Sequence, residues 1–264
     1  MTNDNSPVQL ERSDQHATIW INRPDALNAL NEEALRGLAE SVQSLAKLSP
    51  SERRVVLVRG RGEKSFVAGA DIKLMQRATD SELRQFVELG QSVMRDLEAL
   101  PCPVVAVLQG FAIGGGLELA LACDLIIAST RAKLGQAEVL LGLIPGFGGT
   151  QRLQLRCGVG AARRLIFTGE TVTAEEAHRI GIVDWLVEPE NLDATAEQVC
   201  RDLAARGPMA LAAAKQAIQQ TTRDMIDAGL AAEVDQFVRL FRYQDTQEGL
   251  SAFIEKRKPQ FTGN

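Results

Sequence analysis

One stretch of the sequence, residues 104–123, restricts what this chain can fold into more than any other. It carries a single charged residue, Glu118, and three consecutive glycines, Gly114 to Gly116, divide it into two apolar parts. A carboxylate in the middle of a lipid-spanning helix is costly, and the glycines interrupt the apolar run, so the stretch argues against a membrane span. It predicts instead a buried strand, a glycine turn and a buried helix.

On either side of this stretch, the first two thirds of the chain alternate between strand and helix patterns. Apolar runs predict strands at residues 17–22, 55–58, 104–108, 124–128 and 182–187, with 8–12 as a hairpin partner of the first. Amphipathic patterns predict helices over residues 32–48, capped by Asn31, and 81–100, and a third that begins at a capping box of Thr173 and Glu176. From about residue 192 onward every pattern is helical. The sequence therefore predicts an α/β fold followed by helices, with a boundary near residues 190–200.

The composition is that of a globular enzyme and argues against several other classes of protein. With 45% hydrophobic residues the chain is too apolar for disorder, and its net charge of -5 provides no broad cationic surface for nucleic acid or an anionic membrane. The only histidines, His16 and His178, are far apart in the sequence, which disfavours a zinc site or a Ser-His-Asp triad. The four cysteines form no CxxC pair and the N-terminus shows no signal peptide, so we expect a reducing cytoplasm.

Glu118 is the first candidate for a functional residue. Its predicted helix is apolar on every side, and burying a carboxylate without partners is expensive. A functional carboxylate is one explanation; a structural salt bridge or a position at the solvent edge are the alternatives. The glycines before this helix would let a ligand approach the backbone, where free N–H groups suit an oxygen that gains negative charge, although a tight turn is the simpler explanation.

Two further segments have the same character. Residues 68–73 lead from a predicted strand through small residues toward a helix, and could supply a second N–H donor to an oxyanion hole, while Asp71 is explained as a helix cap. Glu138 precedes an apolar stretch and a glycine-rich loop at residues 146–149. Taken alone, Glu138 is explained most simply as an exposed residue at a helix start.

Together these segments resemble the crotonase, or enoyl-CoA hydratase/isomerase, superfamily. The resemblance rests on four ordered motifs: Ala68-Gly-Ala-Asp-Ile-Lys73, Ile113-Gly-Gly-Gly-Leu-Glu118, Gly135-Gln-Ala-Glu138 and Ile144-Pro-Gly-Phe-Gly-Gly-Thr-Gln-Arg-Leu153. It covers nearly the whole chain, from Asn22-Arg-Pro-Asp-Ala-Leu-Asn28 to Glu255-Lys-Arg-Lys258. The visible departure is Leu117, where many hydratases carry a cysteine, and we expect no chemistry from that side chain.

The resemblance implies a fold, an assembly and a set of site residues. The fold is a crotonase-like spiral of ββα units, residues 1–195, which holds the acyl-CoA site, followed by a C-terminal helical region for trimerisation and for covering the site, residues 196–264. Trimers of the family often pair into hexamers. The backbone N–H groups of Ala70 and Gly115 match the oxyanion hole, and Glu118 and Glu138 match the two acid/base glutamates. The residues that match CoA-binding or water-binding positions are Ala26, Leu27, Ala68, Asp71, Ile72, Gly146 and Lys256, the last of which reaches CoA on a neighbouring subunit.

The implied reaction is the addition of water to the 2,3 double bond of a 2-enoyl-CoA, which gives a 3-hydroxyacyl-CoA. It needs a base for the water, an acid for Cα and donors for the enolate-like oxygen, and the motifs supply all three. No metal is expected, and no separate cofactor, because CoA enters with the substrate. Alternatives are a Δ3-Δ2-enoyl-CoA isomerase or another acyl-CoA reaction of the superfamily, and more remotely a non-catalytic RNA- or CoA-binding protein. The acidic charge balance disfavours RNA binding, and the absence of a GxGxxG motif after an early strand disfavours a dinucleotide-binding enzyme.

Overall fold

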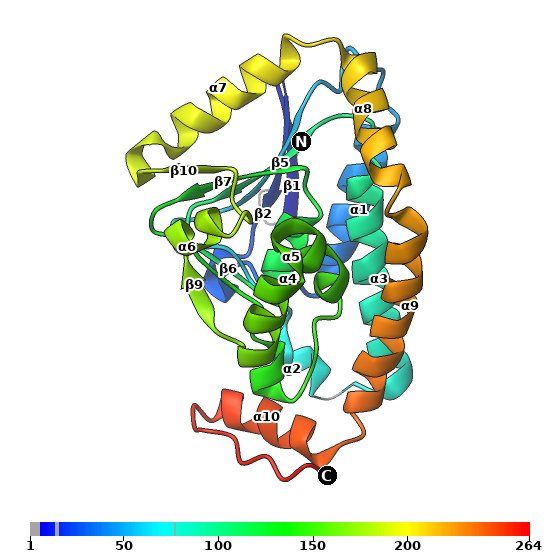
Figure 1. Cartoon of the computed structure of the whole chain (residues 1–264), viewed down its shortest axis with the longest axis vertical. Coiled ribbons are helices and arrows are strands. Elements are labelled where there is room, and N and C mark those ends of the chain that lie inside the picture. The colour runs from blue at the N-terminus through cyan, green and yellow to red at the C-terminus, as the bar shows by residue number, and fades with distance from the viewer. Residues whose placement is uncertain (1–5, 14–15, 77) are drawn as a thin grey trace.

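Two β-sheets, one of six strands and one of four, form the centre of the fold (Figure 1). The computed structural model describes residues 6–13, 16–76 and 78–264, and every statement about structure below refers to these. The larger sheet has the order β1 (Val8–Arg12), β2 (Ala17–Ile21), β3 (Val56–Gly60), β5 (Val104–Leu108), β7 (Leu125–Ser129), β10 (Trp185–Val187). The smaller sheet has the order β4 (Ser65–Ala68), β6 (Phe111–Ile113), β8 (Lys133–Gly135), β9 (Thr171–Thr173).

The chain visits the two sheets in turn, which makes it a spiral. The pairs β3–β4, β5–β6 and β7–β8 each place one strand in the larger sheet and the next in the smaller one. Helical segments follow each pair: α2 (Ile72–Met75) and α3 (Asp80–Glu98), then α4 (Gly115–Leu121), then the short η2 (Glu138–Leu141) and α5 (Gly149–Thr168). Strands of successive turns are parallel neighbours, whereas β1 and β9 pair antiparallel at one edge of each sheet. The expected spiral of ββα units is confirmed.

Strands β3 and β5 are covered on both faces, which explains the continuous apolar runs at residues 55–58 and 104–108. Val56 and Val58 belong to the main core, with α1 (Glu32–Ala46) and α3 on that side, whereas Val55 and Leu57 face a second core under α7 (Leu192–Ala204). Alternate side chains therefore enter different cores, and both cores exclude water. The predicted cap of α1 is confirmed, because the Asn31 side chain accepts a hydrogen bond from Ala34 N at 2.9 Å.

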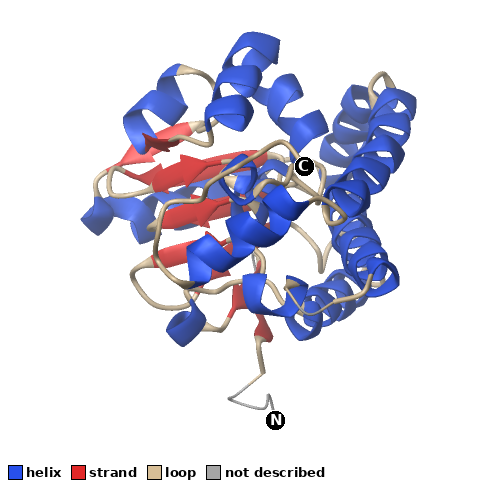
Figure 2. Ribbon diagram, turned by 90° about the horizontal axis from the view of Figure 1, so that it is seen from below, coloured by secondary structure: helices blue, strands red, loops and turns tan. Residues whose placement is uncertain are grey.

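The last part of the chain is helical, as predicted, and it packs back onto the spiral. After the short helices α6 (Ala174–Arg179) and η3 (Pro189–Asn191), it comprises α7, α8 (Pro208–Gln220), α9 (Arg223–Leu240) and α10 (Gln244–Ile254). Helix α9 runs beside α3 along one side of the molecule (Figure 1). Helix α10 contacts η2. Figure 2 shows the strands in the interior of the fold with helices around them. The boundary at residues 195/196 falls inside α7, whose Leu192 and Val199 pack on the same sheet. The division into a core and a helical region stays a prediction.

Some local predictions differ from the structure. The short strands of the smaller sheet have three or four residues each, too few to show an alternating pattern, and the sequence patterns did not predict them. The capping box at Thr173 is half wrong: Thr173 accepts from Glu176 N, but the Glu176 carboxylate pairs with Arg164 and Arg179. A complete capping box begins α3 instead, at Thr79 and Glu82. Within the described ranges, no helix is long and apolar enough to cross a membrane.

Candidate active site

Three parallel strands of the smaller sheet bring the sequence motifs together. Ala68, Ile113 and Gly135 end β4, β6 and β8, and they are paired in register, Ala68 with Ile113 and Ile113 with Gly135. The segments that follow, residues 69–71, 114–116 and 136–138, therefore leave the same edge of the sheet side by side. Ligands of parallel sheets bind beyond this carboxyl edge. Register alone thus explains why motifs far apart in the sequence meet at one place.

Two of the glycines at residues 114–116 are required by close packing. Gly114 has a positive φ of 54°, and a Cβ atom on it would lie 2.7 Å from Oε1 of Glu138. A Cβ atom on Gly116 would lie 1.9 Å from the carbonyl oxygen of Val67 in β4. Larger residues would push Glu138 out of place or separate α4 from the sheet. From the sequence, these glycines could serve a tight turn or a close approach of the backbone to a functional group. The structure shows both, a turn at Gly114 and its close approach to Glu138.

Two backbone N–H groups at this edge are available as donors. Gly115 is the first residue of α4, so its N–H lies in the first turn, where no intrahelical acceptor exists. Ala70 forms an isolated parallel β-bridge with Leu30, in which Leu30 N donates to Gly69 O and Asp71 N donates to Leu30 O. These bonds use the groups on either side of Ala70, and the N–H of Ala70 itself has no acceptor among the described residues. A Cβ atom on Gly115 would lie 3.6 Å from Ala70 N, so the two donors are close. They can bind a single oxygen atom.

Glu118 is buried in the middle of α4, with only 2% of its surface exposed. Its Oε1 accepts hydrogen bonds from Phe147 N at 2.8 Å and from Gly149 N at 2.6 Å, whereas no described residue donates to Oε2. Burial raises the pKa of Glu118 well above its usual range, and the negative charges of Glu138 and Glu233 raise it further. The two N–H groups oppose this rise. One oxygen is therefore fixed to the glycine-rich loop, and the other is free to hold a proton or water.

Glu138 begins η2 and is half-buried rather than exposed at a helix start. Burial raises the pKa of Glu138 to about 8, and the charge of Glu233 contributes to the rise. The fully buried Gln136 amide can donate to Glu138 Oε1 and Oε2 over 3.1 and 3.0 Å. A carboxyl group with such a pKa exchanges a proton near neutral pH, which suits general acid–base chemistry.

Both carboxyl groups and both N–H donors line one cavity of about 370 Å³. The rest of its wall is mostly apolar. Helix α2 contributes Met75, η2 contributes Leu141, and the C-terminal helices contribute Phe237 and Phe253. The arrangement can hold an apolar chain while two acids and two donors face its polar end.

Eight of the eleven residues predicted from the resemblance line this cavity: Leu27, Ala68, Ala70, Ile72, Gly115, Glu118, Glu138 and Gly146. Three others do not. Ala26 is exposed in the short helix η1 (Pro24–Ala26), and Asp71 faces Arg23 at 3.4 Å. Lys256 lies exposed just after α10, in a left-handed conformation with φ 56°.

The sequence analysis missed a third buried carboxylate, Glu233, which is 3% exposed. It lies in α9 on the same face as the apolar residues Leu230, Val234 and Phe237. A charged residue inside an apolar stripe is the same signal that identified Glu118 in α4. The pattern was therefore present in the sequence, although it could not show that Glu233 meets the other two glutamates.

Comparison with known proteins agrees with the fold and shows the family. The sequence profile of the family described as "Enoyl-CoA hydratase/isomerase" matches residues 11–264, and the chain belongs to this family. It is 43% identical over 254 residues to the crotonyl-CoA hydratase of Syntrophomonas wolfei, covering 96% of this chain and 97% of the relative. It is 45% identical over 251 residues to the short-chain-enoyl-CoA hydratase of Clostridium acetobutylicum, with 95% of each chain covered. An enoyl-CoA hydratase structure from Mycobacterium avium subsp. paratuberculosis superposes with a TM-score of 0.88 at 31% identity, covering 97% of this chain and 98% of that one.

The raised carboxyl pKa values make the stability of the protein depend on pH. Because the folded state raises the pKa of Glu138 from its usual value to about 8, it binds more protons than the unfolded chain between these two values. Stability is therefore lost as the pH rises through about 8. We expect Glu138→Gln to raise Tm relative to the wild type at about pH 8.5, by about 2–4 °C for each kcal/mol relieved, and less at about pH 5. Calorimetry at both pH values tests this, and a difference that does not grow with pH would contradict it.

Proposed function

We propose that this protein is an enoyl-CoA hydratase, which adds water across the 2,3 double bond of a 2-enoyl-CoA and releases a 3-hydroxyacyl-CoA. The observation that carries the proposal is one apolar cavity in which two carboxyl groups with raised pKa values face two free backbone N–H donors. The names of the two bacterial relatives, crotonyl-CoA hydratase and short-chain-enoyl-CoA hydratase, support the same reaction. Two glutamates and no metal are sufficient for it.

In this mechanism, Ala70 N and Gly115 N bind the thioester oxygen and stabilise the negative charge that it gains. Oε2 of Glu118, which no described residue binds, holds the water and accepts its proton as the oxygen attacks Cβ. Glu138, protonated near neutral pH, donates a proton to Cα. The mechanism requires one proton on the pair, held by Glu138, because Glu118 must be ionised to accept the proton of the water.

The cavity wall supports an acyl-CoA as the substrate. Leu27, 41% exposed, lines both the apolar cavity and a neighbouring hollow of about 340 Å³ that also includes Arg61 and Lys64. A thioester with its acyl group in the cavity would extend past Leu27 toward this hollow, where Lys64 suits a phosphate of CoA. Asp25 and Glu63 line the same hollow, and Arg61 pairs with Glu11. Ala68 and Ile72 line the cavity end of this path. Roles for Ala26 and Asp71 in CoA binding stay predictions.

The proton on this pair gives the reaction a defined pH dependence. Glu138 donates only while the pair retains its proton, and the pKa of about 8 means that the proton is lost above about pH 8. We expect kcat/KM to fall about tenfold for each pH unit above this value. Rate measurements between about pH 6 and 10 on the wild type test this. A flat profile up to about pH 10 would contradict the role of Glu138 as the acid.

The Δ3-Δ2-enoyl-CoA isomerase is the second candidate, because the same family also contains isomerases. Hydration removes the conjugated absorbance of crotonyl-CoA, whereas isomerisation of a 3-enoyl-CoA creates it. We expect the purified protein to consume crotonyl-CoA at least ten times faster than it conjugates 3-hexenoyl-CoA, an order-of-magnitude expectation for a transition state that fits one reaction. The reverse ratio would favour the isomerase.

We also propose that the protein assembles as a homotrimer or a hexamer. Several large apolar side chains are exposed on α5, α8 and α9: Phe167 (74%), Met209 (68%), Ile218 (74%) and Met225 (61%). Exposed apolar surface of this kind supports an interface between subunits. Light scattering tests the mass, and a monomer would contradict the proposal. The approach of Lys256 to CoA on a neighbouring subunit and the cytoplasmic location stay predictions.

A further inference from the structure

Four consecutive backbone N–H groups of the glycine-rich loop point alternately at two buried carboxylates. Phe147 N and Gly149 N donate to Glu118, whereas Gly148 N donates to Glu233 at 2.6 Å and Thr150 N donates to Glu233 at 3.0 Å. Glu118 belongs to α4 inside the spiral, and Glu233 belongs to α9 in the C-terminal helical part. The loop is therefore held between the two parts of the fold, with one carboxylate on each side.

All of the acceptor capacity of Glu233 is used. Oε1 accepts from Gly148 N and from Gln91 Nε2 at 3.2 Å, and Oε2 accepts from Thr150 N and the Thr150 hydroxyl group. An ionised carboxylate has about four lone-pair positions, and four donors occupy them. Burial raises the pKa of Glu233, and the hydrogen bonds from Thr150 and Gly148 oppose that rise. A proton on Glu233 would displace one of the four donors, so this geometry favours the ionised form. Glu118 differs, because no described residue donates to its Oε2.

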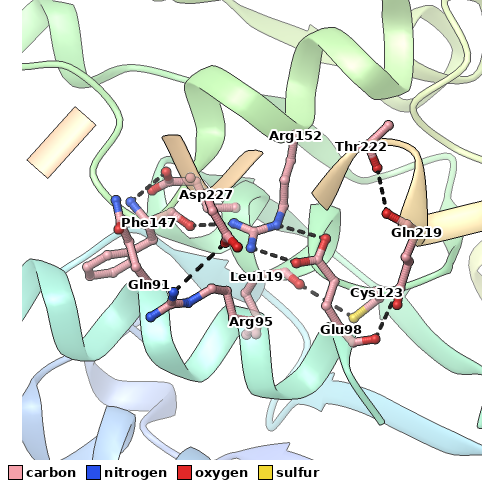
Figure 3. A network of polar contacts seen from close by, with 12 residues as sticks. Gln91, Arg95, Glu98, Leu119, Cys123, Phe147, Arg152, Gln219, Thr222 and Asp227 are labelled. Carbon is pink, nitrogen blue, oxygen red and sulfur yellow. Dashed lines mark hydrogen bonds and ion pairs between the residues drawn. The ribbon is translucent and has the colours of Figure 1, made fainter. Parts of the chain in front are cut away.

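Glu233 has no direct ion-pair partner among the residues that the structure describes. Arg152, in α5, contributes an attraction to Glu233 but pairs with Glu98 of α3 at 2.7 Å and donates to the carbonyl oxygen of Phe147 at 2.9 Å. Figure 3 shows the Arg152 side chain reaching between Phe147 and Glu98, with Gln91 beside Phe147. From α3, Gln91 also donates to Gly146 O at 3.2 Å. The other charges that face Glu233 are the carboxyl groups of Glu118 and Glu138.

We propose that Glu233 is a positioning residue for the hydration reaction: its carboxylate, held by four donors, fixes the glycine-rich loop against Glu118, and its negative charge keeps a proton on the Glu118–Glu138 pair. This inference rests on the proposed function. Fixing Gly148 and Thr150 aims the intervening N–H of Gly149 at Oε1 of Glu118, so that Oε2 is left toward the cavity. The same negative charge raises the pKa of Glu118 and of Glu138. Helix α9 thus sets both the geometry and the protonation of the site.

The test is Glu233→Gln, with Asp235→Asn as a matched control. Asp235 lies two residues further along α9, has a side chain that is 68% exposed, and pairs with Arg84, so its replacement removes the same charge without touching the loop. A glutamine at 233 presents an amide nitrogen to backbone donors and cannot hold them all. We expect kcat to fall about 10- to 100-fold with KM changed less than about threefold. We also expect the alkaline limit of kcat/KM to move down by about one pH unit, whereas the control keeps the wild-type profile.

Thr150→Val provides a milder second variant, because it removes one donor to Glu233 and keeps the shape of the side chain. It should shift the pH profile in the same direction by a smaller amount. Wild-type kcat and pH profile in both variants would overturn the inference. A fall in Tm and kcat with an unchanged pH profile would also overturn it, since that is the result of a merely structural role.

A separate readout distinguishes failure of this inference from failure of the proposed function. Carbon-13 NMR of protein labelled at the glutamate carboxyl carbons follows the titration of Glu118 and Glu138 without any substrate. In Glu233→Gln the carboxyl signals that titrate near pH 8 should move to lower pH, and in Asp235→Asn they should not. Unmoved signals would overturn the inference about Glu233 even if the wild type hydrates crotonyl-CoA. Moved signals with an inactive wild type would support the effect of Glu233 on the protonation of the pair and would contradict the proposed function.

Discussion

Replacing Glu138 with glutamine is expected to lower kcat for crotonyl-CoA hydration by about 10²–10⁴-fold and to change KM by less than about threefold. The amide keeps the size of the side chain and its contact with Gly114, but it cannot give a proton to Cα. Because the pKa of Glu138 is raised to about 8, the wild-type group is an acid at neutral pH, and the substitution removes a function rather than a charge. Steady-state kinetics on the two proteins measures the loss.

A matched control for this substitution is Glu190→Gln. Glu190 is exposed in η3 and does not line the cavity. It should keep wild-type kinetics. A Glu138→Gln variant that retains more than about a tenth of the wild-type kcat would contradict the assignment of Glu138 as the acid. A large rise in KM with an unchanged kcat would instead assign Glu138 to substrate binding.

For Glu118, two substitutions separate chemistry from positioning. Glu118→Gln retains an oxygen that can accept from Phe147 N and Gly149 N, but its amide cannot accept a proton from water. We expect a loss of about 10²–10⁴-fold in kcat with Tm nearly unchanged. Glu118→Ala should lose similar activity and also destabilise the fold by about 1–3 kcal/mol for each buried N–H left without an acceptor.

Calorimetry and kinetics on the two Glu118 variants together decide the point. If the alanine variant is inactive and the glutamine variant is active, Glu118 acts only by holding the loop, and its role as the base is wrong. If both lose activity while only the alanine variant loses stability, both roles of Glu118 are supported. The expected outcome is the second.

Much of the fold could be predicted from local patterns, and the limits of that prediction have a physical cause. The long buried elements, such as α1 and β5, follow from apolar periodicity and caps, which act over a few residues. Strands β4, β6 and β8 are too short to carry a pattern, although their carboxyl ends assemble the site. Their formation depends on pairing between distant segments, and a single sequence does not show such pairing.

The site shows the same division. Glu118 could be singled out from the residues alone, because a charge within an apolar helix must find partners. Glu138, Ala70 and Gly146 became candidates through the family resemblance, since each has an ordinary local explanation. Glu233 escaped notice because its partners are 85 residues away at Gly148 and 142 residues away at Gln91. Only the packing of α9 against α3 and α5 brings these groups together.

The central claim is that this cavity adds water to a 2-enoyl-CoA with Glu138 as the proton donor to Cα. The most direct measurement is incubation of crotonyl-CoA with the purified protein in deuterium oxide, followed by mass spectrometry and NMR of the product. We predict 3-hydroxybutyryl-CoA with one deuterium on Cα, formed by the wild type and not detectably by Glu138→Gln over the same time. Recovery of unchanged crotonyl-CoA from folded wild-type protein, or equal product formation by the variant, would contradict the account.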